Sequence, residues 1–258
     1  GQAQLSFDQK GYLTMRPYGT AAWNARLDLA GITGLLHVHG GAYLGGKIYF
    51  AVSRLDAAVY YLDLYSYDLA TLTWAKATQV SSDAVTRHDG LVQVWNNKVW
   101  IVDWEWDVGT NTVDLYSWDG TTLEYCSNIN SQVNTGGTTY INDAPGETEL
   151  MINYVEQVAG IWYLAVADNV NRESTYIYMI DLNAFAASVV TPATSFYAHT
   201  FYNGTHYLMC SDKKLYSWVP GSNLLTEILT YNSAAYNAWP VGLSSSGDGK
   251  LWTMLGTP

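Results

Sequence analysis

The chain has 258 residues, of which 48% are apolar and only 14% are charged, with 21 Tyr and 11 Trp. This length fits one large domain or two small ones, and the abundance of aromatic and β-branched residues favours half-buried β-strands. The formal net charge of −11 excludes the basic surface that nucleic acids require and disfavours an anionic membrane surface. No apolar run reaches the ~18 residues of a membrane span, so no membrane insertion is expected. No signal peptide is visible.

The N-terminal residues predict a β-hairpin with strands at 5–8 and 12–16. The segment 17–34 follows as a polar connecting loop with room for one irregular strand, and it contains Trp23, Asn24 and Arg26.

Four units of four strands are predicted next, separated by turn residues and by loops rich in Ser, Asn, Thr and Gly. Their strands cover 35–39, 47–53, 59–68 and 72–76; 91–95, 98–104, 112–118 and 121–126; 149–157, 161–167, 175–180 and 187–191; and 196–202, 205–210, 214–218 and 226–229. Two further strands, 239–244 and 250–255, make half of another unit. No helix is expected, apart from a turn at 181–187.

One hairpin recurs through the chain, and its repetition indicates the architecture. Leu64-Tyr-Ser-Tyr-Asp68 has counterparts that begin at Leu5, Leu115, Ile177 and Leu215, at steps of 38 to 62 residues. Such a repeat predicts one all-β domain over 1–258, a five-bladed β-propeller of four-stranded antiparallel blades. The blades cover about 34–76, 90–126, 149–191, 195–230 and 238–258, and the N-terminal hairpin, 4–16, completes the last blade. A two-sheet sandwich, the alternative, does not explain the repeat.

The hairpin also carries a family resemblance. Tyr67 and Trp74 are separated by six residues, and Trp118 and Tyr125 keep this spacing with the aromatics exchanged. The chain in this respect resembles the kelch-type propellers and the lectin-like five-bladed propellers. The resemblance implies a propeller used for binding. Five-bladed relatives include tachylectin-like lectins and arabinanase-like glycosidases, so it leaves the function open.

In a propeller, the loops that enter each first strand and those that join strands two and three share one face, the expected binding surface. They are 17–34, 77–90, 127–148, 192–195 and 230–238, with 54–58, 103–112, 168–174 and 211–213. On this face, the alternating aromatics and carboxylates Trp104, Glu105, Trp106 and Asp107 suit a sugar, as do Trp23, Asn24, Arg26, Tyr236 and Trp239. Packing between blades is the alternative role of both groups.

Some titratable residues could support a metal ion or catalysis. His37 and His39 share one strand face and could ligate a metal ion, given a third ligand such as Asp89 or Asp103. The run Arg87-His88-Asp89 lies just before another predicted first strand. No ligand-spacing motif recurs, however, so these histidines are expected to be solvated or core-lining, and no metal or cofactor is predicted. The innermost predicted strands hold no acid at their centres, so no catalytic residue is predicted and an enzyme is not favoured.

Other residues are expected to be structural. Asp8, Asp68, Asp119 and Asp181 recur at the outer hairpin turn, where an Asp side chain caps its own turn. Cys126 and Cys210 fall in different blades that do not touch, so both are predicted to be free thiols.

The resulting hypothesis is a non-enzymatic recognition module that binds a glycan or a protein partner through the propeller face. The low charge, the Tyr and Trp content and the Asn/Thr/Gly loop at 127–148 fit an extracellular or virion-surface setting, such as a lectin or a receptor-binding tail component. A glycoside hydrolase of the five-bladed type is the first alternative. A structural subunit that assembles into a larger complex is the second.

Overall fold

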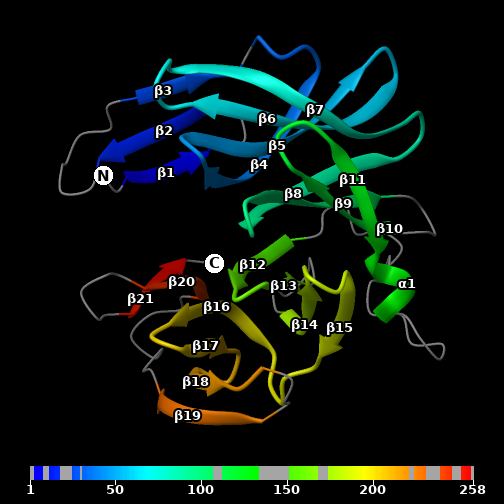
Figure 1. Ribbon diagram of the computed structural model, residues 1–258. Helices are drawn as coiled ribbons and strands as arrows, with labels where there is room; N and C mark the ends of the chain where they lie inside the picture. The colour runs from blue at the N-terminus through cyan, green and yellow to red at the C-terminus, as the bar shows by residue number, and fades with distance from the viewer. Residues whose placement is uncertain are drawn as a thin grey trace. The chain divides into compact units, whose positions relative to one another are not determined.

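The computed structural model describes residues 3–7, 12–17, 25–29, 31–106, 112–133, 151–167, 174–220, 224–230, 239–245 and 251–256. The strands form antiparallel sheets, and one short helix, α1 (Ile129–Val133), is present in these residues. The chain divides into two compact units, residues 1–131 (unit 1) and 132–258 (unit 2). Figure 1 shows the strands of both units.

Unit 1 contains three sheets. A three-stranded sheet is made of β1 (Ala3–Phe7), β2 (Tyr12–Pro17) and β3 (Ala25–Asp28). A four-stranded sheet follows in the order β4 (Leu35–Leu44), β5 (Lys47–Asp56), β6 (Val59–Asp68) and β7 (Thr73–Asp83). The third runs in the order β8 (Arg87–Trp95), β9 (Lys98–Trp106), β10 (Thr112–Trp118) and β11 (Leu123–Asn128). The innermost strands β4 and β8 lie against each other.

Unit 2 repeats this organisation. One four-stranded set comprises β12 (Met151–Val158), β13 (Ile161–Ala167), β14 (Ser174–Asp181) and β15 (Ala186–Val190). The next comprises β16 (Phe196–Tyr202), β17 (Thr205–Cys210), β18 (Lys214–Trp218) and β19 (Leu225–Thr230), and a single bridge between Ser174 and Phe196 joins the two sets. β20 (Trp239–Ser245) pairs with β21 (Leu251–Gly256), and β20 lies against β16.

Local sequence explains the turns. At the outer hairpin, the Asp68 carboxylate accepts hydrogen bonds from the backbone amides of Ala70 (2.9 Å) and Thr71 (3.1 Å). Asp119 and Asp181 make the same pair of bonds with the residues two and three positions ahead, as predicted. The fourth member of this set, Asp8, lies outside the described residues.

The hairpins between first and second strands use two consecutive residues with positive φ. This geometry is that of a type I′ turn, which Asn and Gly tolerate best. It occurs at Asn96-Asn97, Ala159-Gly160 and Asn203-Gly204, as predicted from these residue types.

Apolar residues on alternating positions form the cores between sheets. In unit 1, Leu62, Leu64, Val92 and Ile101 pack between the β4–β7 and β8–β11 sheets. Gly90 permits the close approach, because a Cβ there would lie 2.9 Å from that of Ala51. The opposite face of the β4–β7 sheet is covered by Leu29 and Ile32. In unit 2, Tyr163, Phe196 and Trp218 belong to one core cluster. Cys126 and Cys210 are free thiols, as predicted.

Several predicted boundaries were wrong. β4 continues to Leu44, because Gly40 (φ 32°) lies at a bulge that lets the ladder continue past the predicted loop. β8 begins at Arg87 rather than Leu91, so the innermost strand includes the acid Asp89. The helix α1 was not predicted.

The N-terminal hairpin forms as predicted, with Leu5 opposite Met15. The irregular strand allowed for in the loop 17–34 is β3, which pairs with β2. In the described residues, however, β1–β3 and β20–β21 are separate sheets, whereas the sequence predicts one four-stranded last blade. Described segments therefore establish an all-β chain with four complete four-stranded antiparallel sheets.

Candidate functional site

Loops predicted to share the binding face meet in each unit. In unit 1, the amide of Leu55 donates to the carbonyl of Gly34 at 2.8 Å. Gly34 has a φ of 70°, and a Cβ there would lie 1.9 Å from the carbonyl oxygen of Leu55, so only glycine fits. In unit 2, the amide of Ser211 donates to the carbonyl of Ser195 at 2.9 Å. Strand-two ends and strand-one starts thus lie together, as the predicted face requires.

A cavity of about 310 Å³ opens in unit 1 beside this contact. The segment 31–33 lines one side, and Tyr65 and the half-buried indole of Trp74 contribute aromatic surface. Charged side chains line the rest, namely Arg54, Asp56, Asp63 and Lys76. The cavity therefore combines aromatic faces with hydrogen-bonding groups of both charges.

Ion pairs hold the charged lining in place. The fully buried Asp63 accepts a hydrogen bond from Arg54 Nε at 2.6 Å, and its other carboxylate oxygen lies 2.8 Å from Lys76 Nζ. Arg54 also pairs with the more exposed Asp56 at 3.2 Å and stacks over the ring of Tyr61 at 3.8 Å. Because these contacts fix Arg54 at several points, the cavity wall is preorganised.

A second polar group lies at the start of β8. The buried hydroxyl of Ser53 donates to the carbonyl of His88 at 2.5 Å and lies 2.7 Å from His39 Nε2. His39 Nε2 is 3.2 Å from the Asp89 carboxylate, which also binds Arg87 at 3.3 Å. Burial works to raise the pKa of Asp89, but the hydrogen bond from His39 and the nearby positive charges outweigh it and lower this pKa to about 2.

This Ser, His and Asp set lacks the geometry of a hydrolase triad. In a triad, the two ring nitrogens of the histidine separately contact the serine and the carboxylate. Here the same nitrogen of His39 contacts both the serine and the carboxylate, and the Ser53 hydroxyl donates its hydrogen bond to the backbone carbonyl of His88. Ser53 as a whole is only 1% exposed, so its hydroxyl is not available to a substrate.

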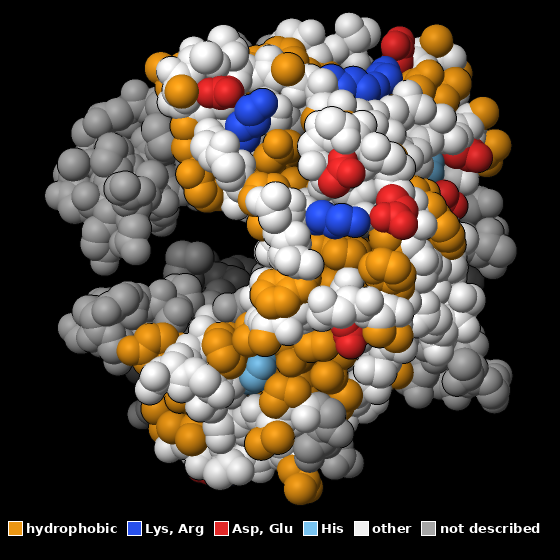
Figure 2. All heavy atoms as spheres, in the orientation of Figure 1, with side chains coloured by type: hydrophobic (Ala, Val, Ile, Leu, Met, Phe, Trp, Pro, Cys, Tyr) orange, Lys and Arg blue, Asp and Glu red, His pale blue; other side chains and the backbone are white. Residues whose placement is uncertain are grey.

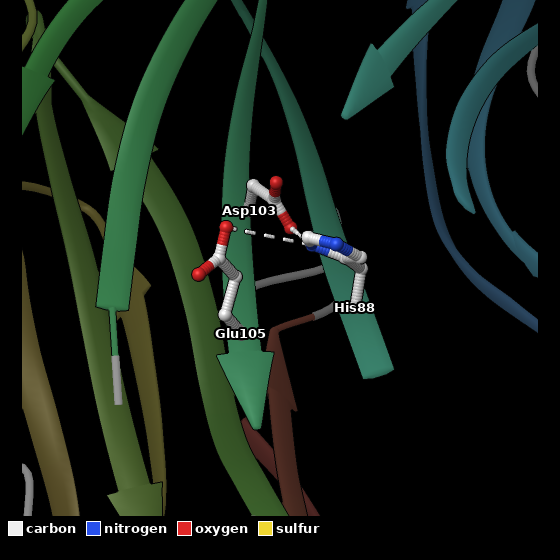
Figure 3. A group of neighbouring side chains, drawn as sticks. All are labelled: His88, Asp103 and Glu105. Atoms are coloured by element: carbon white, nitrogen blue, oxygen red, sulfur yellow. Dashed lines mark hydrogen bonds and ion pairs between the residues drawn. The ribbon is translucent and has the colours of Figure 1, made fainter. Parts of the chain in front are cut away.

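A third polar group, made of His88 on β8 with Asp103 and Glu105 on β9, lies on the face toward the β4–β7 sheet. Figure 3 shows the carboxylates of Asp103 and Glu105 on one side of the His88 imidazole. His88 Nδ1 lies 3.1 Å from Asp103 and 3.9 Å from Glu105, and it is also 3.2 Å from the Ser81 hydroxyl. Burial works to lower the pKa of His88, but the hydrogen bond and charge of Asp103, aided by Glu105, outweigh it and raise this pKa.

The potential around this group is negative. Burial raises the pKa of Asp114, and the charges of Glu105 and Asp103 add to this effect. Burial likewise raises the pKa of Tyr116, and the same carboxylates reinforce it. The described residues therefore place several carboxylates around one imidazole.

The predicted sugar-binding residues have different positions. Trp104 is only 2% exposed, so its indole is part of the packed interior. Glu105 is half-buried and accepts a hydrogen bond from the Thr112 hydroxyl. The backbone alone is described for three others, Arg26 on β3, Trp106 on β9 and Trp239 on β20. Trp23, Asn24, Asp107 and Tyr236 lie outside the described residues.

The predicted face segments 17–34 and 54–58 include part of the cavity lining, but the lining residues on β6 and β7 were not predicted. Asp63 was the available signal, because it is the one carboxylate within the apolar and aromatic stretch 59–65. A buried charge of this kind needs cationic partners. Lys76, which lies two residues beyond Trp74 and so on the same face of β7, is the nearest such partner in the repeated hairpin.

Charged groups are sparse on the face drawn in Figure 2, where most of them lie over unit 1 among apolar and uncharged polar side chains. Within the described part of the chain, no helix is long and apolar enough to span a membrane.

Comparison with known proteins identifies the fold. No protein-family profile and no curated protein matches the chain. Among solved structures, YCF48 bound to D1 peptide is similar with a TM-score of 0.61 and 10% identity, over 98% of this chain and 72% of that one. The α-L-arabinofuranosidase Arb93A from Fusarium graminearum, in complex with an iminosugar inhibitor, is similar with a TM-score of 0.54 and 13% identity, over 95% and 80%. These structures are β-propellers, and the chain is similar to them in fold.

Proposed function

We propose that this chain is a non-catalytic recognition module that binds a glycan in the cavity beside Trp74 and Tyr65. The supporting observation is the combination of an indole and a phenol with Arg54, Lys76 and Asp56 around about 310 Å³. An aromatic face stacks on the C–H side of a pyranose, and the charged groups donate to and accept from its hydroxyls. The volume is at the small end of ordinary ligand cavities, which fits a terminal sugar.

The cavity is better suited to binding than to hydrolysis. A glycosidase needs two carboxyl groups on opposite sides of the scissile bond, one of them free to donate or accept a proton. Asp63 is held by Arg54 and Lys76 and has no exposed surface, so it is a poor acid or base. Asp56 is the one carboxylate of the cavity that reaches solvent, with 46% of its side chain exposed.

Replacement of Trp74 tests this proposal. Trp74→Ala removes the stacking surface, so the affinity for the best ligand on a glycan array should fall roughly tenfold or more. Trp74→Phe should retain part of it. The matched control is Trp95→Ala, which removes another half-buried indole of unit 1 away from the cavity. Binding should be measured by isothermal titration calorimetry. If the wild type binds no glycan, or if Trp74→Ala binds as tightly as wild type, the proposal is wrong.

A protein partner is the second candidate, supported by the peptide bound to the similar propeller YCF48. In this alternative the predicted face, including Trp23, Arg26, Glu105, Trp106 and Trp239, holds an extended peptide. Competition distinguishes the two, because a free monosaccharide would displace a glycan from the cavity but would leave a peptide bound across the face.

Glycoside hydrolysis is the enzymatic alternative, supported by the likeness to an arabinofuranosidase. The test is release of nitrophenol from a nitrophenyl arabinofuranoside. Activity in the wild type that disappears in Glu105→Gln would favour hydrolysis over the binding function.

We also propose that the sheets belong to one five-bladed ring, in which the N-terminal hairpin and β20–β21 complete the fifth blade. Such closure removes the open edges that a half-blade would leave.

An extracellular or virion-surface setting suits the low content of charged residues in the chain. The predicted binding face is also compatible with a structural role, in which the chain assembles into a larger complex.

A further inference from the structure

His88, Asp103 and Glu105 form a compact group of potential metal ligands. One ligand atom from each residue lies within 4.8 Å of the other two. His88 and Glu105 are directly opposite each other on β8 and β9, and Asp103 is two residues before Glu105 on the same face. Two paired strands therefore fix all three Cα positions.

The spacing suits a small divalent cation. Imidazole nitrogens and carboxylate oxygens bind first-row cations at ~2.0–2.2 Å, so two such ligands lie between about 3 and 4 Å apart around one ion. His88 Nδ1 is 3.1 Å from the nearest Asp103 oxygen and 3.9 Å from the nearest Glu105 oxygen. Both separations fall in this range, and Figure 3 shows the two carboxylates turned toward the imidazole.

Two buried polar atoms of this group lack hydrogen-bond partners. Asp103 is completely buried, and its Oδ2 accepts no hydrogen bond in the described residues. His88 is 1% exposed, and its Nε2 is also without one. Buried polar groups are normally satisfied, and a cation bound by both oxygens of Asp103 would satisfy its Oδ2. It would not satisfy His88 Nε2, because Nδ1 is the ring nitrogen that faces the two carboxylates. When the imidazole is deprotonated, as metal binding requires, the two carboxylates leave a charge of −2 that a divalent cation would balance.

A neighbouring residue holds Glu105 in place. The Thr112 hydroxyl donates to Glu105 from β10, and Thr112 is directly opposite Glu105 in the ladder. Such an outer contact orients the ligand and raises metal affinity.

We propose that His88, Asp103 and Glu105 bind one divalent first-row cation, Zn²⁺ or Mn²⁺. An imidazole with two carboxylates suits these ions better than Mg²⁺, which prefers oxygen ligands. Glu105 is the solvent-facing ligand, with 29% of its side chain exposed, so the ion keeps a coordination position open to water on that side. The site lies at the ends of β8 and β9 that border the predicted binding face, and it does not depend on the proposed glycan cavity.

Calorimetric titration of the chelator-treated full chain with ZnCl₂, MnCl₂ and MgCl₂ tests the site. Zn²⁺ or Mn²⁺ should bind, and saturation should raise the Tm by roughly 5 °C. Glu105→Gln and Asp103→Asn should each weaken binding more than about 100-fold and abolish the rise in Tm. The matched control is Glu124→Gln, an exposed carboxylate of the same sheet that pairs with Lys98.

The outcomes separate the site from its alternatives. Since Asp103 is buried and its replacement can impair folding, the half-exposed Glu105→Gln variant decides the test. If that variant binds the cation as tightly as wild type, the metal binds elsewhere and the proposal is wrong. If wild type binds neither Zn²⁺ nor Mn²⁺, a proton on His88 balances the carboxylates instead, and the proposal is also wrong.

Discussion

At the residue scale, unit 2 contains a buried pair of histidines that are joined by one hydrogen bond. His199 Nε2 lies 2.9 Å from His206 Nδ1, and the two residues are 1% and 3% exposed. The rings of Tyr163 and Trp218 contact both. Burial lowers the pKa of His206 to about 4, and burial together with the neighbouring His206 lowers that of His199 well below its usual value.

This pair predicts a loss of stability in mild acid. In the unfolded chain, both histidines take up protons below about pH 6.5, whereas the folded pair stays neutral to about pH 4. The unfolded state therefore binds more protons, and the free energy of unfolding should fall by up to ~1.4 kcal/mol per pH unit for each histidine over this window. Urea denaturation between pH 7 and pH 4 measures the slope.

Two variants control this measurement. His199→Phe/His206→Phe removes both titrating groups and should flatten the slope between pH 6.5 and 4. Phe201→Leu changes the packing on His206 without removing a titrating group, so it should lower stability equally at all pH values. An unchanged slope in the double variant would contradict the assignment to this pair.

At the scale of the element, the repeated outer hairpin combines a favourable Asp cap with an unfavourable backbone conformation. Leu72 has a φ of 58°, and its counterpart in the third complete sheet, Phe185, has a φ of 54°. In this left-handed region a non-glycine residue is less stable by roughly 1–2 kcal/mol than in the right-handed one. The hairpin retains it because the amide of Leu72 donates to the carbonyl of Asp68 at 2.9 Å, which closes the turn.

Leu72→Gly should therefore stabilise the protein. The side chain is 62% exposed, so little burial is lost, and the net gain should be about 0.5–1 kcal/mol after the greater freedom of glycine in the unfolded chain is included. Leu72→Ala is the matched control, because it removes the exposed side chain but keeps the Cβ that causes the strain. Chemical denaturation compares the three proteins. Equal gains in both variants would place the effect in the side chain instead of the backbone.

At the scale of the whole molecule, the proposed ring and the two compact units predict different unfolding behaviour. In a closed propeller every blade packs on two others, so the chain should unfold in a single transition whose calorimetric and van't Hoff enthalpies agree. Two independent domains would give two transitions. Differential scanning calorimetry of the full chain distinguishes these results, and a chain without residues 1–17 should melt at a lower temperature if the N-terminal strands close the ring.

Local chemistry made much of the fold predictable. The cap at Asp119 and the turn at Asn203-Gly204 involve only residues within three positions of each other, so the local sequence is sufficient to predict them. The strands follow from alternation in the same way. The boundaries that were missed, at Leu44 and Arg87, depend on a bulge and on pairing with a neighbouring strand, which local patterns do not encode.

The candidate sites were less predictable because they depend on which sheet faces which. Glu105 was singled out for sugar binding beside Trp104, whose ring is buried. Asp103 was considered as a third ligand for His37 and His39, but not together with His88, because the pairing of β8 with β9 appears only once β8 is seen to begin at Arg87.

By itself, the sequence determined the repeated four-stranded units and their turn chemistry, since both follow from short-range patterns. It also determined the free thiols, since the repeat assigns the two cysteines to different blades. Tertiary structure alone decided which side chains meet: Trp74 with Arg54 around a cavity, and His88 with Asp103 in a buried cluster. The physical reason is that strand alternation assigns a side chain to a face, whereas the packing of separate segments and sheets decides what that face contacts.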